Sequence, residues 1–162
     1  MSSIAQKRTF HIEAFRPELQ RQTAEFIDSV WADLGRILRR DGAGADIFSI
    51  SKTYQQNGGE FWLAMEHDNV IGTVGIQTLD RKRALLRRWY VSPKKRGMGV
   101  GSTLLKIALD HARSSHSFDT VWLSTRRESV EAHRLFEKYG FTKITHLSLS
   151  YHSDLYMQLK LK

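Results

Sequence analysis

A glycine-rich stretch between a hydrophobic segment and a long helical pattern constrains the fold of this chain most. It runs from Val91 to Ser102 and reads Val-Ser-Pro-Lys-Lys-Arg-Gly-Met-Gly-Val-Gly-Ser. Glycine lets backbone N–H groups approach a ligand without a Cβ clash, and the start of a helix favours negative charge. The stretch therefore predicts a strand, an anion-binding loop and a helix, in that order. An exposed glycine-rich turn would have the same composition, so the loop alone leaves both interpretations open.

The spacing of the three glycines excludes two other nucleotide-binding loops. Gly97, Gly99 and Gly101 alternate with Met98 and Val100. A Walker A loop would continue with Lys-Ser or Lys-Thr after its last glycine, and the dinucleotide fingerprint needs G-x-G-x-x-G. The predicted anion site belongs to neither class.

Length and composition indicate one domain, 1–162, with a hydrophobic core. The chain has no cysteine, which excludes disulfides and a cysteine nucleophile. Its seven histidines include no H-x-x-x-H pair, so we expect no metal. No apolar run approaches the ~20 residues that span a bilayer, and residues 1–8 lack the apolar region of a signal peptide. We expect a cytoplasmic protein without a membrane partner.

Positive charge is concentrated in one part of the chain. The formal net charge is +8, and residues 81–96 contain eight Lys and Arg and no acid. Such a stretch can attract an anionic ligand or a nucleic acid, but it carries no nucleic-acid-binding motif, so we expect no nucleic-acid partner. A strand over 84–91 would be about 26 Å long at ~3.3 Å per residue. Arg81, Lys82 and Arg83 are therefore expected far from the glycine loop, on an exposed face.

Hydrophobic periodicity predicts an α/β domain on one mixed sheet. The only parallel crossover required connects strand 84–91, through the helix after the glycine loop, to strand 120–125. This places the glycine loop at the carboxyl end of a strand, where α/β sheets usually bind ligands. Gly72 and Gly75 indicate a bulge or tight packing. The full set of predicted strands is 8–15, 60–66, 70–79, 84–91, 120–125, 142–151 and 154–161, and the predicted helices are 18–39, 46–56, 100–116 and 128–139.

Two motifs in this order resemble the GNAT superfamily of N-acetyltransferases. Arg96-Gly-Met-Gly99-Val-Gly101 is similar to the family signature Arg/Gln-x-x-Gly-x-Gly/Ala for acetyl-CoA, and Val91-Ser-Pro93 precedes it. The segment 132–141, Ala-His-Arg-Leu-Phe-Glu-Lys-Tyr-Gly-Phe, resembles a second family element. The resemblance covers nearly the whole chain and is strongest over 59–141. It implies a mostly antiparallel central sheet flanked by helices, with splayed fourth and fifth strands.

The resemblance also implies a function and a cofactor site. Acetyl-CoA would be the co-substrate, and a primary amine, small or in a peptide, would attack it directly in a ternary complex. The loop amides would hold the pyrophosphate and the strand before the loop would pair with pantetheine. A homodimer is compatible with the family. The implied cofactor contacts are Trp89, Tyr90, Val91, Arg96, Gly97, Met98, Gly99, Val100, Gly101, Ser102 and Ser129.

Three positions depart from the family pattern, one at the cofactor arm and two at positions for proton transfer. Ser129 replaces an Asn that contacts pantetheine, Ser124 replaces a carboxylate base, and Phe136 replaces a Tyr that would protonate the leaving thiolate. Ser129 could equally serve only as a helix cap. Phe136 is expected in the core.

Two other residues are candidates for proton transfer. Glu60, beside Phe61 and Trp62, is the candidate general base, and Tyr139 is the candidate acid one helical turn after position 136. A surface carboxylate and an ordinary packing tyrosine are the alternatives. His133 is expected on the exposed face of its helix.

Two function classes compete with an N-acetyltransferase. One is a CoA-binding module without turnover, in which the missing Tyr and Asn reflect lost catalysis. The other is a nucleic-acid binder that uses the basic stretch.

If the protein is an enzyme, its positively charged site favours the neutral form of the acceptor amine. We therefore expect an acceptor that is not a polycation.

Overall fold

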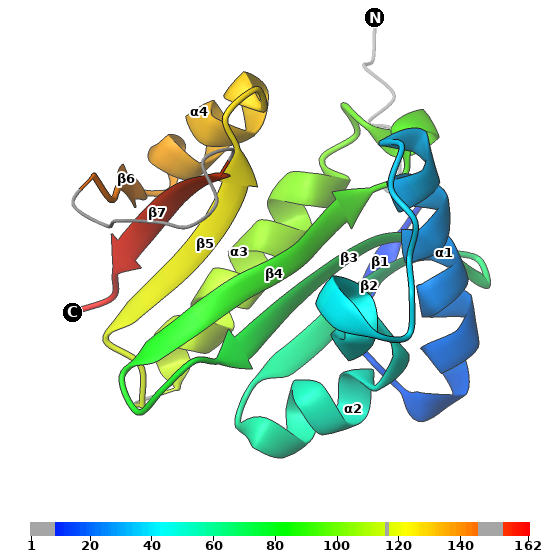
Figure 1. Ribbon diagram of the computed structural model, residues 1–162, viewed down its shortest axis with the longest axis horizontal. Helices are drawn as coiled ribbons and strands as arrows, with labels where there is room; N and C mark the ends of the chain where they lie inside the picture. The colour runs from blue at the N-terminus through cyan, green and yellow to red at the C-terminus, as the bar shows by residue number, and fades with distance from the viewer. Residues whose placement is uncertain (1–8, 116, 146–153) are drawn as a thin grey trace, which may run out of the picture.

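A seven-stranded sheet runs through the computed structural model, which describes residues 9–115, 117–145 and 154–162 (Figure 1). The strands are β1 (His11–Ala14), β2 (Glu60–Glu66), β3 (Asn69–Thr78), β4 (Arg83–Val91), β5 (Thr120–Arg126), β6 (Thr142–Lys143) and β7 (Asp154–Lys160). Their order in the sheet is β1-β2-β3-β4-β5-β7-β6. All neighbours are antiparallel except β4 and β5. The predicted mixed, mostly antiparallel α/β fold is confirmed.

Helices cover both faces of this sheet and enclose two hydrophobic cores. The helices are α1 (Gln20–Asp33), α2 (Ile50–Thr53), α3 (Val100–Ser114) and α4 (Val130–Lys138). The buried stripe of α3 packs with Trp62 and Ala64 of β2 in one core, which Phe136 of α4 joins. Phe61 and Leu63 of the same strand point to the other face and pack with α1. Because successive strand residues face opposite sides, a strand covered on both faces reads as a continuous hydrophobic run.

Two predicted helices are shorter than the hydrophobic pattern indicated. The prediction of a helix over 18–39 is wrong beyond Asp33, because Gly35 takes a left-handed φ of +70° and ends α1. Ile37 fitted the helical spacing but its side chain is 74% exposed. The predicted helix 46–56 is divided into 3₁₀ segments, Gly42–Phe48 and Gln55–Asn57, on either side of α2.

The C-terminal strands follow the prediction only in part. The predicted strand 142–151 is observed as the two residues of β6, and its positions 146–151 lie outside the described residues. The predicted strand 154–161 is observed as β7, which pairs with β5 along its whole length.

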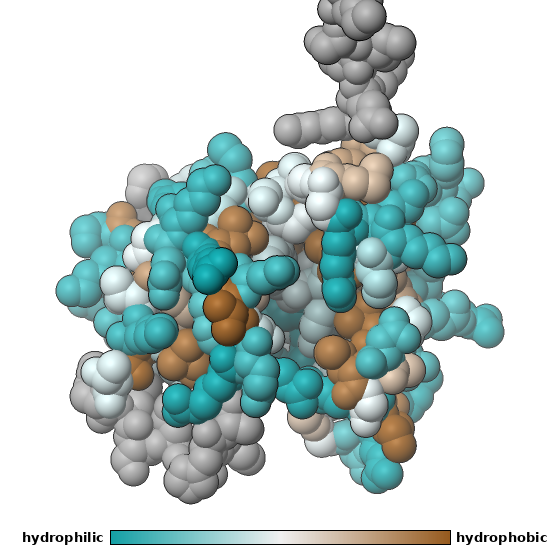
Figure 2. Space-filling model, turned by 90° about the horizontal axis from the view of Figure 1, so that it is seen from above, coloured by the Kyte–Doolittle hydropathy of each residue, from teal (hydrophilic) through white to brown (hydrophobic). Residues whose placement is uncertain are grey.

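Strands β4 and β5 separate after a short paired region. Their parallel register covers only Arg83, Ala84 and Leu85 of β4. Residues 87–91 are all partly exposed, although β4 is a central strand and its other neighbour β3 is mostly buried. Seen from the end where β4 and β5 terminate, the surface is hollowed between the α1 side and the α4 side (Figure 2). The predicted splay of the fourth and fifth strands is confirmed.

Candidate functional site

The glycine-rich loop takes a backbone conformation that requires glycine. Gly97 and Gly99 have φ angles of +78° and +84°, a region that disfavours residues with a Cβ. A Cβ at either position would meet no atom within 4 Å, so these two glycines serve conformation and the space above them is open. At Gly101 a Cβ would lie 3.1 Å from the ring of Trp89. The Nε1 of Trp89 donates to the Gly101 carbonyl oxygen at 2.9 Å, which holds the start of α3 against β4.

The first turn of α3 offers backbone N–H groups to a ligand. The amides that open a helix have no acceptor inside it, and here the amide of Thr103 is the first to bond back, to the carbonyl oxygen of Gly99 at 3.0 Å. The hydroxyl of Thr103 bonds the same oxygen at 2.7 Å. The preceding amides and the positive end of the helix dipole favour an anion. This geometry fits the diphosphate of a nucleotide coenzyme.

The edge of β4 that faces the splay begins at a bulge. The β3–β4 register shifts between Thr73 and Gly75, and Arg88 has a φ of +56°. The hydroxyl of Thr73 donates to the Arg88 carbonyl oxygen at 2.7 Å. Residues after the bulge, Trp89 to Val91, have no β5 partner. Their backbone groups toward β5 can therefore pair with an extended ligand, as an added strand would.

A buried ion pair joins this bulge to the segment Gly42–Phe48. The Arg88 guanidinium donates to both oxygens of Asp46, at 2.6 and 3.0 Å, and to the Ala43 carbonyl oxygen at 2.6 Å. The hydroxyl of Tyr54 donates to Asp46 Oδ2 at 2.6 Å. Burial would raise the pKa of Asp46, but hydrogen bonds and charge from Arg88 outweigh burial, and the pKa lies below its usual value. Burial and the Asp46 charge raise the pKa of Tyr54. At neutral pH the network therefore holds an ionised aspartate and a neutral phenol.

Aromatic residues join α1 to the same face of β4. The Nε1 of Trp31 donates to the Tyr90 hydroxyl oxygen at 2.9 Å. The Arg36 guanidinium lies 4.2 Å from the centre of the Trp31 ring, and that of Arg88 lies 5.4 Å from it. The Tyr90 phenol can still donate its own proton. Side chains of α1, β4 and the segment Gly42–Phe48 therefore meet beside the splay.

The candidate residues on α4 lie on the other side of the splay. Ser129 precedes α4 and its hydroxyl makes no capping hydrogen bond. Phe136 is buried, as expected, with its ring 5.2 Å from that of Trp89. Tyr139 follows the helix, and its hydroxyl donates to the Ser102 carbonyl oxygen at 3.4 Å. On β5, Ser124 is exposed. Tyr139 is thus close to the first turn of α3, where the loop residues predicted to bind the cofactor also lie.

Glu60 begins β2, two strands away from β4 in the sheet. It is opposite Ile76 of β3, which is opposite Leu86. The Oε1 atom of Glu60 accepts hydrogen bonds from the Gln55 side chain at 2.7 Å and from the Phe61 amide at 2.8 Å. Its Oε2 atom accepts none from the described residues. The structure does not bring Glu60 and Tyr139 into contact.

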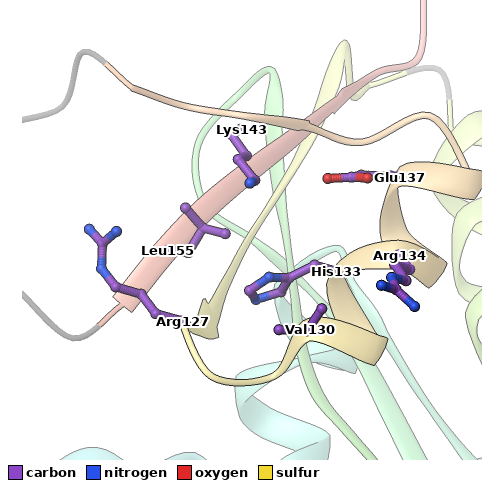
Figure 3. Close-up of a pocket in the computed structure, with 7 residues that line it drawn as sticks. All are labelled: Arg127, Val130, His133, Arg134, Glu137, Lys143 and Leu155. Carbon is purple, nitrogen blue, oxygen red and sulfur yellow. The ribbon is translucent and has the colours of Figure 1, made fainter.

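A surface pocket of about 370 Å³ lies between α4, β6 and β7 (Figure 3). The pocket is lined by the side of α4 that points away from Phe136 and Tyr139. It is therefore separate from the splay between β4 and β5. The expectation that His133 is exposed is wrong, because this side chain is 8% exposed and its Nε2 donates to the Arg126 carbonyl oxygen at 2.8 Å. The lining residues are Arg127, Val130, His133, Arg134, Glu137, Lys143 and Leu155.

Sequence analysis missed the side chains that face the splay from the α1 side. The predicted helix 46–56 contains Asp46 without a role for it, and the sequence distinguishes Arg87 and Arg88 only as members of the basic stretch 81–96. One local signal is present in residues 85–88, Leu-Leu-Arg-Arg. Two hydrophobic residues followed by two basic ones break the alternation of a strand, which indicates a bulge. Their shared partner Asp46, 42 residues before Arg88 in the chain, has no local signal.

Comparison with known proteins identifies one family. The sequence pattern of the Acetyltransferase (GNAT) family matches residues 17–141. N-acetyltransferase family 8 member 2 of Rattus norvegicus is 33% identical over 111 residues, which cover 65% of this chain and 49% of the relative. N-acetylaspartate synthetase of Xenopus tropicalis is 30% identical over 101 residues, which cover 61% of this chain and 37% of the relative. The chain thus spans about half the length of these relatives or less.

Solved structures share the whole fold. An acetyltransferase of Streptococcus agalactiae superposes with a TM-score of 0.81 at 26% identity, covering 95% of this chain and 99% of the other. A Salmonella typhimurium protein, described with its cofactor acetyl-CoA, superposes with a TM-score of 0.74 at 20% identity and 95% coverage of both chains. Acetyl-CoA is the co-substrate of GNAT acetyltransferases. With its glycine loop, its splayed strands and a match over 17–141, the chain belongs to the GNAT family of acetyltransferases.

Proposed function

We propose that this protein transfers an acetyl group from acetyl-CoA to a primary amine by direct attack in a ternary complex. One observation carries the proposal. The free edge of β4 runs from a bulge at Arg88 to a loop of left-handed glycines at the start of α3. The loop can bind the diphosphate of a coenzyme, and the unpaired edge of β4 next to it can pair with an amide-containing arm of the same molecule. The family match and the names of the relatives support the same reaction.

The cofactor residues have distinct proposed tasks. Acetyl-CoA would supply the acetyl thioester. The amides of residues 97–102 would hold the pyrophosphate, with Arg96 at the edge of the loop. The backbone of Trp89, Tyr90 and Val91 would pair with the pantetheine arm, and Ser129 would face it from α4. A backbone N–H at the bulge would stabilise the negative charge that develops on the thioester oxygen.

Proton transfer is proposed for Glu60 and Tyr139. The reaction forms a C–N bond and breaks a C–S bond, so the amine loses a proton and the leaving sulfur gains one. The Glu60 carboxylate would take the first proton, directly or through a water, with Oε1 anchored and Oε2 open. The Tyr139 phenol, beside the first turn of α3, would give the second. With no cysteine in the chain, no cysteine-linked acyl intermediate forms.

A binding assay and an acetylation screen together test the proposal. Acetyl-CoA should raise the melting temperature of the protein, because a ligand that binds only the folded state stabilises it. Incubation with acetyl-CoA and a panel of amino acids, peptides, monoamines, aminoglycosides and polyamines should release CoA with at least one amine. A thermal shift without CoA release from any amine would instead support a CoA-binding module. Absence of both would contradict the assignment of the site.

A further inference from the structure

The bulge in β4 turns two successive arginines to the same face of the sheet. Neighbouring strand residues normally face opposite sides, and a bulge interrupts this alternation. Arg87 and Arg88 both reach Asp46, with Arg87 Nη2 3.6 Å and Arg88 Nη2 2.6 Å from its Oδ1. Both therefore lie on the α1 side, in the stretch of β4 that β5 leaves free.

The charges in this cluster do not balance. One carboxylate faces two guanidiniums, and in the described part of the chain Asp46 is the only ion-pair partner of either arginine. Both Asp46 oxygens already accept strong hydrogen bonds from Arg88, and Tyr54 occupies Oδ2 as well. Arg87 makes its own short hydrogen bond to a neutral group, the Gln77 side-chain oxygen at 2.9 Å. One positive charge is left without a full counter-charge.

The surrounding side chains add to the positive charge. Arg36 stacks on the ring of Trp31, 4.2 Å from its centre, and Arg88 lies 5.4 Å from the centre of the same ring. Asp41, at the start of the segment Gly42–Phe48, is exposed and forms no ion pair with the described residues. The face of the splay toward α1 therefore favours a ligand that brings a negative charge.

Arg87 and Arg88 differ in how deeply they are buried, and this difference indicates different roles. The Arg88 side chain is 9% exposed and pinned by Asp46 and by the Ala43 carbonyl oxygen, so it holds the bulge in place. The Arg87 side chain is 28% exposed, so a ligand in the splay can reach it. A planar guanidinium can receive a carboxylate through two parallel hydrogen bonds. Partial desolvation strengthens such a pair and makes an unpaired arginine costly.

We propose that the acceptor amine carries a carboxylate, as a free amino acid does, and that Arg87 receives this carboxylate. The inference rests on the proposed acetyl transfer and specifies its acceptor. Arg87 precedes the bulge by one residue, so its guanidinium and the site of amine attack lie on the same short stretch of β4. An acceptor without an anion leaves the charge of Arg87 only partly compensated by Asp46, and a polycation adds repulsion. A partly buried arginine can discriminate between acceptors in this way, because the wrong substrate leaves it without an anionic partner.

Matched acids and amides test the acceptor class. CoA release is measured with glycine, alanine, serine and phenylalanine, and with the α-carboxamide of each. The amide removes the charge but changes the shape little, and it leaves more of the amine neutral, which by itself favours the amide. We expect kcat/KM to be at least tenfold higher for one or more of the acids than for its amide. Equal rates for acid and amide would overturn the inference and leave the proposed function standing.

Substitution of Arg87 tests the residue. Arg87→Gln should lower kcat/KM for the preferred acid ten- to a hundredfold, mainly through KM, and lower it much less for the amide, so that the preference for acid over amide is lost. Arg87→Lys keeps the charge and should recover part of the loss. Arg83→Gln is the matched control, since Arg83 begins the same strand and pairs with Asp80; its preference for acid over amide should equal that of the wild type. The melting temperature of each variant shows that it is folded. An Arg87→Gln protein that keeps the wild-type preference would contradict the assignment.

If no amine is acetylated, the proposed reaction is contradicted, and the carboxylate site is tested by binding alone. Isothermal titration of the four amino acids and their amides into CoA-saturated protein then gives the result. Tighter binding of an acid than of its amide, lost in Arg87→Gln, would support the carboxylate site. No difference between acids and amides would refute it.

Discussion

At the scale of single residues, Asp46 connects the most groups beside the splay. Its carboxylate accepts hydrogen bonds from Arg88 on β4 and from Tyr54 after α2. A buried ion pair contributes little net stability compared with well-packed apolar residues, but removal of one partner leaves an uncompensated charge. Asp46→Asn should therefore lower the free energy of unfolding at pH 7 by about 3 to 5 kcal/mol, measured by urea denaturation.

The pH dependence of that loss follows from the lowered pKa of Asp46. A carboxyl group whose pKa is lower in the folded state stabilises the fold fully above its unfolded pKa of about 3.9. The stabilisation disappears as the pH falls through the folded-state pKa. We expect the difference in unfolding free energy between wild type and Asp46→Asn to be constant from pH 7 to pH 5 and to shrink below pH 4. Asp119→Asn, at an exposed ion pair with Lys162, is the control and should show a much smaller difference. A pH-independent difference for Asp46→Asn would contradict the electrostatic account.

The proposed acid–base residues give a second prediction at this scale. Glu60→Gln should lower kcat by roughly tenfold or more, at or just below the lower end of the ~10²–10⁴ range for general acid–base catalysis. Tyr139→Phe should cost less, since a thiolate leaves readily without a donor. Phe136→Tyr should change little. Steady-state rates with saturating acetyl-CoA measure all three. If Tyr139→Phe removes nearly all activity and still binds acetyl-CoA, Tyr139 is the essential general acid, and the prediction that it contributes less than Glu60 is wrong.

At the scale of elements, the glycine loop and α3 act together. The left-handed φ of Gly99 and the open space above it mean that a side chain there would project toward the proposed phosphate position. Gly99→Glu should abolish the rise in melting temperature caused by acetyl-CoA, because it adds both bulk and negative charge. Gly35→Glu is the matched control, since Gly35 also has a positive φ and open surroundings but lies at the end of α1. An unchanged thermal shift in a folded Gly99→Glu protein would refute the loop assignment.

The packing of α3 on the sheet depends on another glycine. A Cβ on Gly72 of β3 would lie 2.9 Å from Leu104 Cδ1 and 3.1 Å from the Tyr90 carbonyl oxygen. Gly72 therefore allows α3 to approach the sheet where β3 pairs with the end of β4. The tight packing expected at Gly72 is observed, and the expected bulge lies between Thr73 and Gly75.

At the scale of the whole molecule, tertiary contacts divide the basic stretch 81–96. It contains β4 from end to end, and it pairs both with the acid next to it in the chain and with acids of other segments. Arg83 pairs with Asp80 at one end of the strand, and Lys95 pairs with Glu66 of the β2–β3 hairpin at the other. As expected, Arg81 to Arg83 lie at the end of β4 remote from the glycine loop. No helix among the described residues is long and apolar enough to cross a membrane.

This division of charge leads to a prediction about nucleic acids. A nucleic-acid surface needs several cations free to neutralise phosphates together, whereas five of the eight cations of this stretch, Lys82, Arg83, Arg87, Arg88 and Lys95, already form ion pairs with acids. An electrophoretic mobility-shift assay with single- and double-stranded oligonucleotides should show no complex at physiological salt. A salt-dependent shift in the micromolar range would reinstate the nucleic-acid interpretation.

The sequence by itself determined the features that depend on neighbouring residues. Three of these features are local patterns. The glycine spacing predicted the loop, the apolar stripe after Val100 predicted α3, and the alternation of residues predicted the strands of the sheet. The motifs around Gly99 and Phe136 predicted the family. These succeed because backbone conformation and one-sided burial follow from side chains a few positions apart.

Only the tertiary structure decided which distant residues meet. Arg88 and Asp46 are 42 residues apart, and Trp31 and Tyr90 are 59 apart, so no local pattern connects them. Helix α1 ends at Asp33 although Ile37 continues its spacing, because the left-handed conformation of Gly35 stops the helix whatever follows. The surplus charge of Arg87 exists only because a bulge turns it to the same carboxylate as Arg88. A one-residue change in alternation moves a side chain to the other face of a sheet. The contact of Arg87 and Arg88 with one carboxylate therefore depends on how β4 pairs in the folded sheet, which the sequence of the strand alone does not show.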